Sequence, residues 1–69
     1  MRKQNKTVIG VIGLGYVGLP LLLLINKKFK VYGFDIDKKK IEQLKNNQSY
    51  ISDISNKEII SIRNKYFFN

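Results

Sequence analysis

The sequence contains no cysteine, histidine, tryptophan or alanine, and it has one proline among its 69 residues. Without cysteine or histidine, the chain can form no disulfide, zinc-finger site, thiol nucleophile or imidazole base. A domain of about this length buries only about 60% of the surface that its unfolded chain exposes, and small domains usually compensate with disulfides, a metal or a partner. We therefore expect the chain either to oligomerise or to be part of a larger protein, and the motifs below favour the second.

Acidic residues are scarce: five Asp and Glu stand against 13 Lys and Arg, which gives a formal net charge of +8. This balance is typical of proteins that bind nucleic acids or anionic membranes. An AT-rich coding sequence would also explain it, because Lys, Asn and Ile are all abundant. The basic clusters are Arg2, Lys3 and Lys6, then Lys27, Lys28 and Lys30, then Lys38, Lys39 and Lys40. They flank the predicted elements instead of lining one helix face, so we expect no nucleic-acid partner, and a basic nucleic-acid-binding module stays an alternative.

No charged residue occurs between Thr7 and Asn26. The length of this stretch fits a membrane span, so a membrane anchor is an alternative of a different class. A membrane helix would have to accommodate several glycines and Pro20, which are costly in a helix interior. The stretch divides more simply into a strand, a glycine turn and a helix, and we expect no membrane partner.

Hydrophobic patterning predicts strands over residues 7–12 and 30–36, with a helix over residues 19–25 between them. Apolar residues on both faces of the first strand indicate burial on both sides, as in a parallel sheet. Pro20 lies about one turn into the helix, where a missing N–H costs least.

The second half of the chain carries helix-capping signals. Asp37 is predicted to cap a helix over residues 38–45, with Ile41 and Leu44 buried and Asn46-Asn47 at its end. Residues 48–54 are predicted to form a loop.

Ser55 and Glu58 have the spacing of a capping box that begins a further helix. The predicted core-facing residues of that helix are Ile59, Ile60 and Ile62. The run Tyr66-Phe67-Phe68 is expected to approach a third strand a few residues beyond Asn69.

Between the first strand and the helix lies a GxGxxG motif, made by Gly13, Gly15 and Gly18. Gly13 would permit the tight turn, Gly15 would let a pyrophosphate approach the backbone, and Gly18 would let helix and strand pack closely. Free N–H groups around Tyr16 and Val17, at the positive end of the helix dipole, would bind phosphate oxygens. Glycines also end strands and form turns in proteins that bind no nucleotide.

Asp35 follows 22 residues after Gly13, close to the spacing of about 20 for the acid that accepts the ribose hydroxyls. Its charge would repel a 2′-phosphate, which favours NAD over NADP. Asp37 competes for this role but is better placed to cap the next helix. Lys38, Lys39 and Lys40 keep NADP open as an alternative, because a neighbouring cation can accept a 2′-phosphate. Lys38 and Lys39 are expected to be solvated, and Lys40 is expected nearest the adenosine end.

The strings VIGLGYVGLP and GFDIDKKKIEQL resemble the N-terminus of the UDP-glucose/GDP-mannose dehydrogenase family, the nucleotide-sugar 6-dehydrogenases. SYISDIS is more similar to the branch that acts on UDP-N-acetylhexosamines. The resemblance implies NAD-dependent, two-step oxidation of the sugar C6 alcohol to a carboxylate through a cysteine-bound intermediate. In this family a glycine usually precedes the phenylalanine of the second strand. Here Lys28 takes its place, so we expect a shorter or strained turn before Phe29.

The resemblance implies an α/β fold: an incomplete Rossmann-type βαβ unit with parallel strands, the N-terminal part of a doubly wound dinucleotide-binding domain. Residues 1–69 are expected to be only this portion, with the UDP-sugar site, the catalytic cysteine and its supporting residues further along the chain. We expect a cytoplasmic, homo-oligomeric full-length protein whose present segment holds no catalytic residue and no metal. The predicted NAD-binding residues are Gly13, Leu14, Gly15, Tyr16, Val17, Gly18, Asp35 and Lys40.

A rival within the enzymes is a β-hydroxyacid dehydrogenase, which shares the IGLG string at the end of the first strand. That family typically has Met-Gly where this chain has Tyr16-Val17-Gly18. The difference favours the nucleotide-sugar dehydrogenases.

Overall fold

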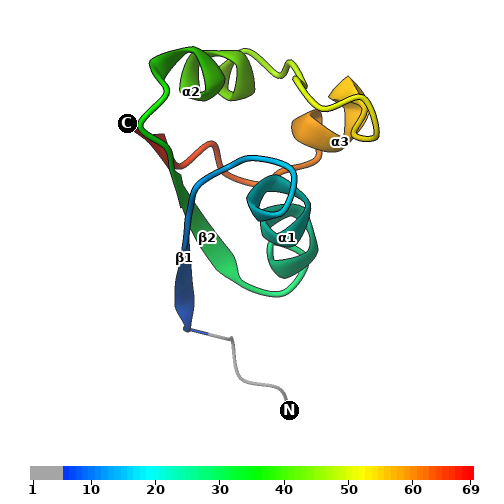
Figure 1. Cartoon of the computed structure of the whole chain (residues 1–69). Helices are drawn as coiled ribbons and strands as arrows, with labels where there is room; N and C mark the ends of the chain where they lie inside the picture. Colours follow the sequence, from blue (N-terminus) through cyan, green and yellow to red (C-terminus); the bar gives the residue numbers. More distant parts are fainter. Residues whose placement is uncertain (1–5) are drawn as a thin grey trace.

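The computed structural model describes residues 6–69, so Arg2 and Lys3 of the first basic cluster lie outside the described residues. Strands and helices alternate along most of the chain (Figure 1). The elements are β1 (Val8–Ile12), α1 (Gly18–Ile25), β2 (Lys30–Phe34), α2 (Lys38–Lys45), α3 (Asn56–Ile60) and β3 (Phe67–Phe68). The predicted small α/β unit is confirmed.

The sheet has the order β1-β2-β3, and both pairs of strands are parallel. Val11 lies beside Gly33, and Gly33 lies beside Phe67. The third strand was expected beyond Asn69, but its pairing with β2 begins earlier. The N–H of Gly33 donates to the carbonyl of Tyr66 at 2.8 Å, and the N–H of Asp35 donates to that of Phe68 at 3.1 Å. The short β3 is therefore already part of the parallel sheet.

One face of the sheet carries the hydrophobic core. A Cβ added to Gly33 would lie 2.9 Å from the Leu22 side chain of α1, 3.0 Å from that of Phe67 and 3.1 Å from that of Leu14. Helix α1 therefore packs directly on the middle strand. The buried core comprises Val11, Leu14, Leu19, Leu22, Val31, Ile41, Leu44, Ile51, Ile54, Ile59, Ile62 and Phe67.

The expected burial of β1 on both faces was wrong. Ile12 is 86% exposed and Val8 is 54% exposed, because no helix of the described chain packs on their side of the sheet. The same face carries a row of stacked rings, with the centroids of Tyr32 and Tyr66 4.8 Å apart and those of Phe34 and Phe68 5.6 Å apart. The two faces of the sheet therefore differ: one is covered by helices, and the other presents aromatic rings.

The turn between α1 and β2 is short but not strained. The N–H of Phe29 donates to the carbonyl of Ile25 at 2.9 Å, so the chain leaves the helix within one turn. Asn47 (φ 61°) is the one non-glycine residue with positive φ within residues 6–69, so Lys28 does not need the left-handed conformation for which glycine is favoured. Of the two alternatives expected for this turn, a shorter or a strained one, the structure shows no strain at Lys28.

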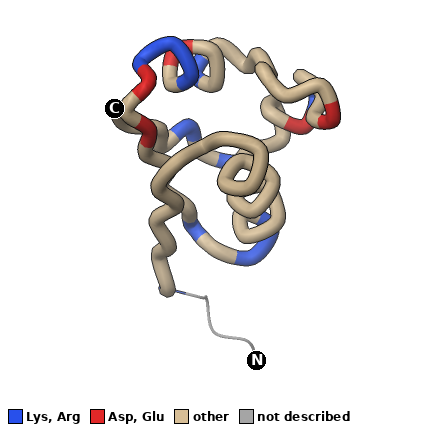
Figure 2. The backbone as a smooth tube through the Cα atoms, viewed as in Figure 1, with Lys and Arg blue, Asp and Glu red and all other residues tan. Residues whose placement is uncertain are grey.

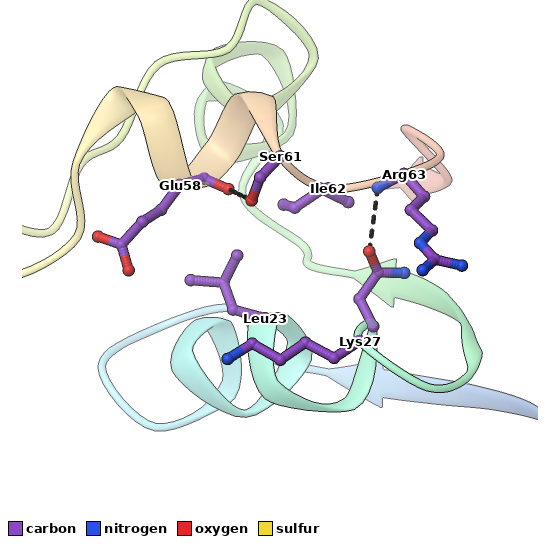
Figure 3. A pocket seen from close by; sticks show the side chains of 7 residues that line it. Leu23, Lys27, Glu58, Ser61, Ile62 and Arg63 are labelled. Atoms are coloured by element: carbon purple, nitrogen blue, oxygen red, sulfur yellow. Dashed lines mark hydrogen bonds between the residues drawn. The ribbon is translucent and has the colours of Figure 1, made fainter.

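Asn26, at the end of α1, ties this turn to the segment before β3. Its buried side-chain oxygen accepts the N–H of Arg63 at 3.0 Å. Asn26 and Arg63 both line a hollow of about 420 Å³. Leu23 and Lys27 lie on one side of this hollow, and Glu58, Ser61 and Ile62 lie on the other (Figure 3). No lining residue of this hollow belongs to the glycine-rich loop.

The predicted caps of the second half are confirmed. The Asp37 carboxylate accepts the N–H of Lys39 at 2.9 Å at the start of α2. At the start of α3, Ser55 and Glu58 bond each other's backbone in a capping box. The prediction that Ile60 faces the core was wrong, since it is 57% exposed. Ile59 and Ile62 are three residues apart and share a face, whereas Ile60 points about 100° away from Ile59.

The uncharged stretch from Thr7 to Asn26 divides into β1, the glycine-rich loop and α1, as predicted. Within residues 6–69, no helix has the length and apolar character needed to cross a membrane. Figure 2 shows basic residues on several elements and not along a single helix. In the described part of the chain, basic residues thus occur on several elements, with Lys38, Lys39 and Lys40 together at the start of α2.

Candidate functional site

The loop between β1 and α1 is shaped by its first and third glycines. Gly13 has a φ of +89°, a backbone conformation that residues other than glycine rarely adopt. Its N–H donates to the carbonyl of Phe34 at 2.8 Å. A Cβ on Gly18 would lie 1.7 Å from the carbonyl oxygen of Gly13. Both positions therefore require glycine for the fold itself.

Gly15 has a different environment. A Cβ added there would meet nothing within 4 Å. The fold does not need glycine at this position, but a ligand that approaches the backbone would use the open space. This is the property expected of the second glycine in a pyrophosphate-binding loop.

Backbone donors line the same loop. Within residues 6–69, the N–H groups of Gly15, Tyr16 and Val17 find no hydrogen-bond acceptor. The Tyr16 and Val17 side chains are 81% and 80% exposed. These donors stand at the N-terminus of α1, where the helix dipole favours an anion. The free N–H groups of Gly15, Tyr16 and Val17 therefore form a candidate phosphate-binding site, the phosphate cradle.

Asp35 lies directly after β2 and beside this loop. Its Oδ2 atom accepts the N–H of Leu14, and its Oδ1 atom accepts the N–H of Asp37, both at 2.8 Å. The Asp37 and Leu14 bonds, with a smaller contribution from the charge of Lys40, lower the pKa of Asp35 below its ordinary value. The carboxylate is therefore ionised at neutral pH, and each oxygen retains a further lone pair for a ligand hydroxyl.

Sequence reasoning missed Tyr50. This half-buried residue lies in the loop between α2 and α3, and its hydroxyl donates to the carbonyl of Leu14 at 2.6 Å. The Nζ atom of Lys40 lies 5.6 Å from the centre of the Tyr50 ring. The signal available in the sequence was an aromatic residue in a predicted loop next to Asn, Gln and Ser, because an aromatic side chain in a polar loop usually packs against another part of the protein.

A pocket of about 340 Å³ adjoins the loop. Gly15, Tyr16, Lys40 and Tyr50 line it, together with residues of α2. The fold thus brings Lys40 to the same pocket as the glycine-rich loop. Asp37 also lines this pocket, and its Oδ1 atom accepts the N–H of Lys39 in α2.

The arrangement suits a dinucleotide. The free N–H groups would bind the phosphates, which could approach the backbone because the space around the Cβ position of Gly15 is open. The ionised Asp35 would accept hydrogen bonds from the hydroxyls of a ribose. The residues required by the predicted NAD site are therefore compatible with that cofactor. Cysteine is absent from the chain, so the described segment offers no thiol for covalent chemistry.

Comparison with known proteins agrees with this chemistry. The UDP-glucose/GDP-mannose dehydrogenase family, NAD binding domain, matches residues 7–68. Protein CapL of Staphylococcus aureus is 39% identical over 88% of this chain and 14% of its own length. UDP-N-acetyl-D-glucosamine 6-dehydrogenase of Salmonella typhi is 52% identical over 61% of this chain and 10% of its own length.

UDP-N-acetyl-D-mannosamine dehydrogenase of Methanococcus vannielii is 42% identical over 74% of this chain and 12% of its own length. The chain therefore spans between 10% and 14% of the length of these three relatives. No solved structure matches it significantly. Since the family match extends over nearly the whole sequence, the chain belongs to the UDP-glucose/GDP-mannose dehydrogenase family, and its residues match the model of that family's NAD-binding domain.

Proposed function

We propose that residues 1–69 are the N-terminal portion of a Rossmann NAD-binding domain, and that Gly15, Tyr16, Val17, Asp35 and Lys40 contact the cofactor. Of the other predicted residues, Gly13 and Gly18 shape the loop, and the N–H, carbonyl and side chain of Leu14 are already engaged within the protein. The observation that carries this proposal is the position of the ionised Asp35 carboxylate. It is bonded to the N–H of Leu14, and the free N–H groups of the loop follow directly after Leu14. A dinucleotide needs an anion site and a diol acceptor at this short separation.

In this proposal each group has a separate task. The N–H groups of Gly15, Tyr16 and Val17 bind the pyrophosphate, and Asp35 accepts the adenosine ribose hydroxyls. The Asp35 charge repels a 2′-phosphate, which favours NAD over NADP, and Lys40 lies at the adenosine end. When bound, NAD supplies a hydride acceptor.

The whole protein is proposed to oxidise the C6 hydroxyl of a UDP-sugar to a carboxylate. Two relatives are named for UDP-N-acetylhexosamines, and SYISDIS also resembles that branch, so a UDP-N-acetylhexosamine is the proposed substrate class. The family match supports this over a β-hydroxyacid dehydrogenase. We further propose a cytoplasmic homo-oligomer without a nucleic-acid or membrane partner, whose substrate site lies outside these residues.

Cofactor titration and turnover of the full-length protein test the proposal. Calorimetry is expected to give tighter binding of NAD⁺ than of NADP⁺. NADH formation, followed at 340 nm, is expected with UDP-N-acetylglucosamine or UDP-N-acetylmannosamine and not with a β-hydroxyacid. Failure to bind NAD⁺ would contradict the cofactor site, whereas NAD⁺ binding without UDP-sugar turnover would contradict only the substrate.

A further inference from the structure

The hydrogen bond from Tyr50 to Leu14 joins two loops that are 36 residues apart in the sequence. Its length of 2.6 Å is at the short end of the range for O–H···O hydrogen bonds. Tyr50 is half-buried, and Lys40 lies over its ring. The loop after α2 thus contacts the glycine-rich loop through one side-chain hydroxyl.

Leu14 is held from three directions. Its N–H donates to Asp35, its carbonyl accepts from Tyr50, and its side chain is fully buried in the core. The two residues that follow Leu14 carry free N–H groups of the cradle. Leu14 is therefore held in place directly before the N–H groups that form the phosphate cradle.

Because the peptide unit is planar, the contact between Tyr50 and the Leu14 carbonyl also affects the N–H of the next residue. The carbonyl of Leu14 and the N–H of Gly15 belong to one planar, trans peptide unit and point in opposite directions. A bond that fixes the carbonyl therefore also fixes the direction of the Gly15 N–H. Glycine tolerates positive φ, so without that bond the Leu14–Gly15 peptide could rotate and turn its N–H away from the cradle.

We propose that Tyr50 is a positioning residue for the dinucleotide: its hydroxyl holds the Leu14–Gly15 peptide with the Gly15 N–H directed at the phosphates. This inference rests on the proposed function. Burial, reinforced by Asp35 and Asp37, raises the pKa of Tyr50 to about 12, so the hydroxyl remains a donor at neutral pH. Tyr50 does not contact the reacting atoms; it acts through the backbone of the loop.

The test compares Tyr50→Phe with Tyr66→Phe in the full-length protein. The first removes only the hydroxyl that bonds Leu14 and keeps the ring below Lys40. The second removes the hydroxyl of a half-buried tyrosine that stacks on Tyr32, away from the loop. Both variants lose one hydroxyl and keep an aromatic ring, so Tyr66→Phe controls for the general effect of losing a tyrosine hydroxyl.

Tyr50→Phe is expected to raise the Kd of NAD⁺ by about 3- to 10-fold, the effect of one neutral hydrogen bond. The KM for NAD⁺ should rise similarly while kcat at saturating NAD⁺ changes less than twofold. In the cofactor-free protein, amide hydrogen exchange of Gly13 and Leu14, whose N–H groups are bonded to Phe34 and Asp35, should be faster in Tyr50→Phe. Tyr66→Phe is expected to leave the Kd, the KM, kcat and the exchange rates at their wild-type values.

An unchanged Kd in Tyr50→Phe, or an equal loss of affinity in both variants, would overturn the proposal. If Tyr50→Phe folds poorly, hydrogen exchange below its unfolding temperature still decides whether Gly13 and Leu14 are selectively loosened. Absence of NAD⁺ binding in the wild-type protein would overturn the proposed function as well. Selective loosening by Tyr50→Phe would then identify the contact as structural only.

Discussion

The carboxylate of Asp35 accepts the backbone N–H of Leu14 at 2.8 Å, and this bond connects the end of β2 to the loop that follows β1. Parallel strands place their carboxyl ends at the same edge of a sheet, so the two segments meet although they are 21 residues apart. The acid proposed to bind the ribose therefore also supports the loop proposed to bind the phosphates.

Replacing Asp35 with alanine is expected to weaken NAD⁺ binding by about 10- to 100-fold, because hydrogen bonds to a charged group are among the stronger ones. Asp37→Ala is the matched control: it removes a helix cap and should lower the free energy of unfolding by about 1 kcal/mol. Its Kd for NAD⁺ should stay within about twofold of wild type. Calorimetric titration and urea unfolding measure the two effects. Equal Kd values for Asp35→Ala and wild type would contradict the ribose assignment.

The stabilising effect of Asp35 should depend on pH. Its pKa is lower in the folded state than the ordinary value of 3.8, because Asp37 and Leu14 donate to the carboxylate. The unfolded state therefore binds more protons between the two pKa values, and stability rises with pH there. The stability difference between wild type and Asp35→Asn should be constant above about pH 5 and should shrink as the pH falls below 3.8. Urea unfolding at a series of pH values measures this, and a difference that grows in acid would contradict the account.

Gly18 and Gly15 should respond differently to alanine. Gly18→Ala would place a Cβ 1.7 Å from the Gly13 oxygen, so α1 must move away from β1. Overpacking of this kind typically costs about 1–3 kcal/mol. Gly15→Ala meets no neighbour and should leave the unfolding free energy nearly unchanged, but it should weaken NAD⁺ binding by filling the space above the cradle. Thermal unfolding and calorimetry separate the two effects. A strongly destabilised Gly15→Ala variant would show that the open space is not reserved for a ligand.

The capping box of α3 should contribute measurably to stability. Ser55 accepts the N–H of Glu58 at 3.2 Å, and the Glu58 carboxylate accepts the N–H of Ser55 at 2.8 Å. Ser55→Ala is expected to cost about 0.5–2 kcal/mol of unfolding free energy, because the short α3 depends on its cap. Ser52→Ala, in the exposed loop before α3, should change it by less than about 0.5 kcal/mol. Urea unfolding at neutral pH compares them, and equal costs would show that the box contributes nothing.

Local sequence signals predicted most of the elements, although β2 ends at Phe34 instead of residue 36 and β3 begins before Asn69. The bounds of α2 and the caps at Asp37 and Ser55 follow from chemistry within one helical turn. The spacing of Gly13, Gly15, Gly18 and Asp35 likewise identified the loop and the acid beside it. The exposure of Ile12 and Ile60 was not predictable in this way, because it depends on which surfaces another element covers.

The amino-acid sequence by itself determined the order of strands and helices, the caps and the nucleotide-binding motif, since each depends on residues close together in the chain. It also excluded a thiol from this segment, because no cysteine is present. Only the tertiary structure decided that Asp35 and Tyr50 both hold Leu14, one at its N–H and the other at its carbonyl. These bonds join residues 21 and 36 positions apart, and their partners are fixed by strand pairing and core packing instead of local spacing.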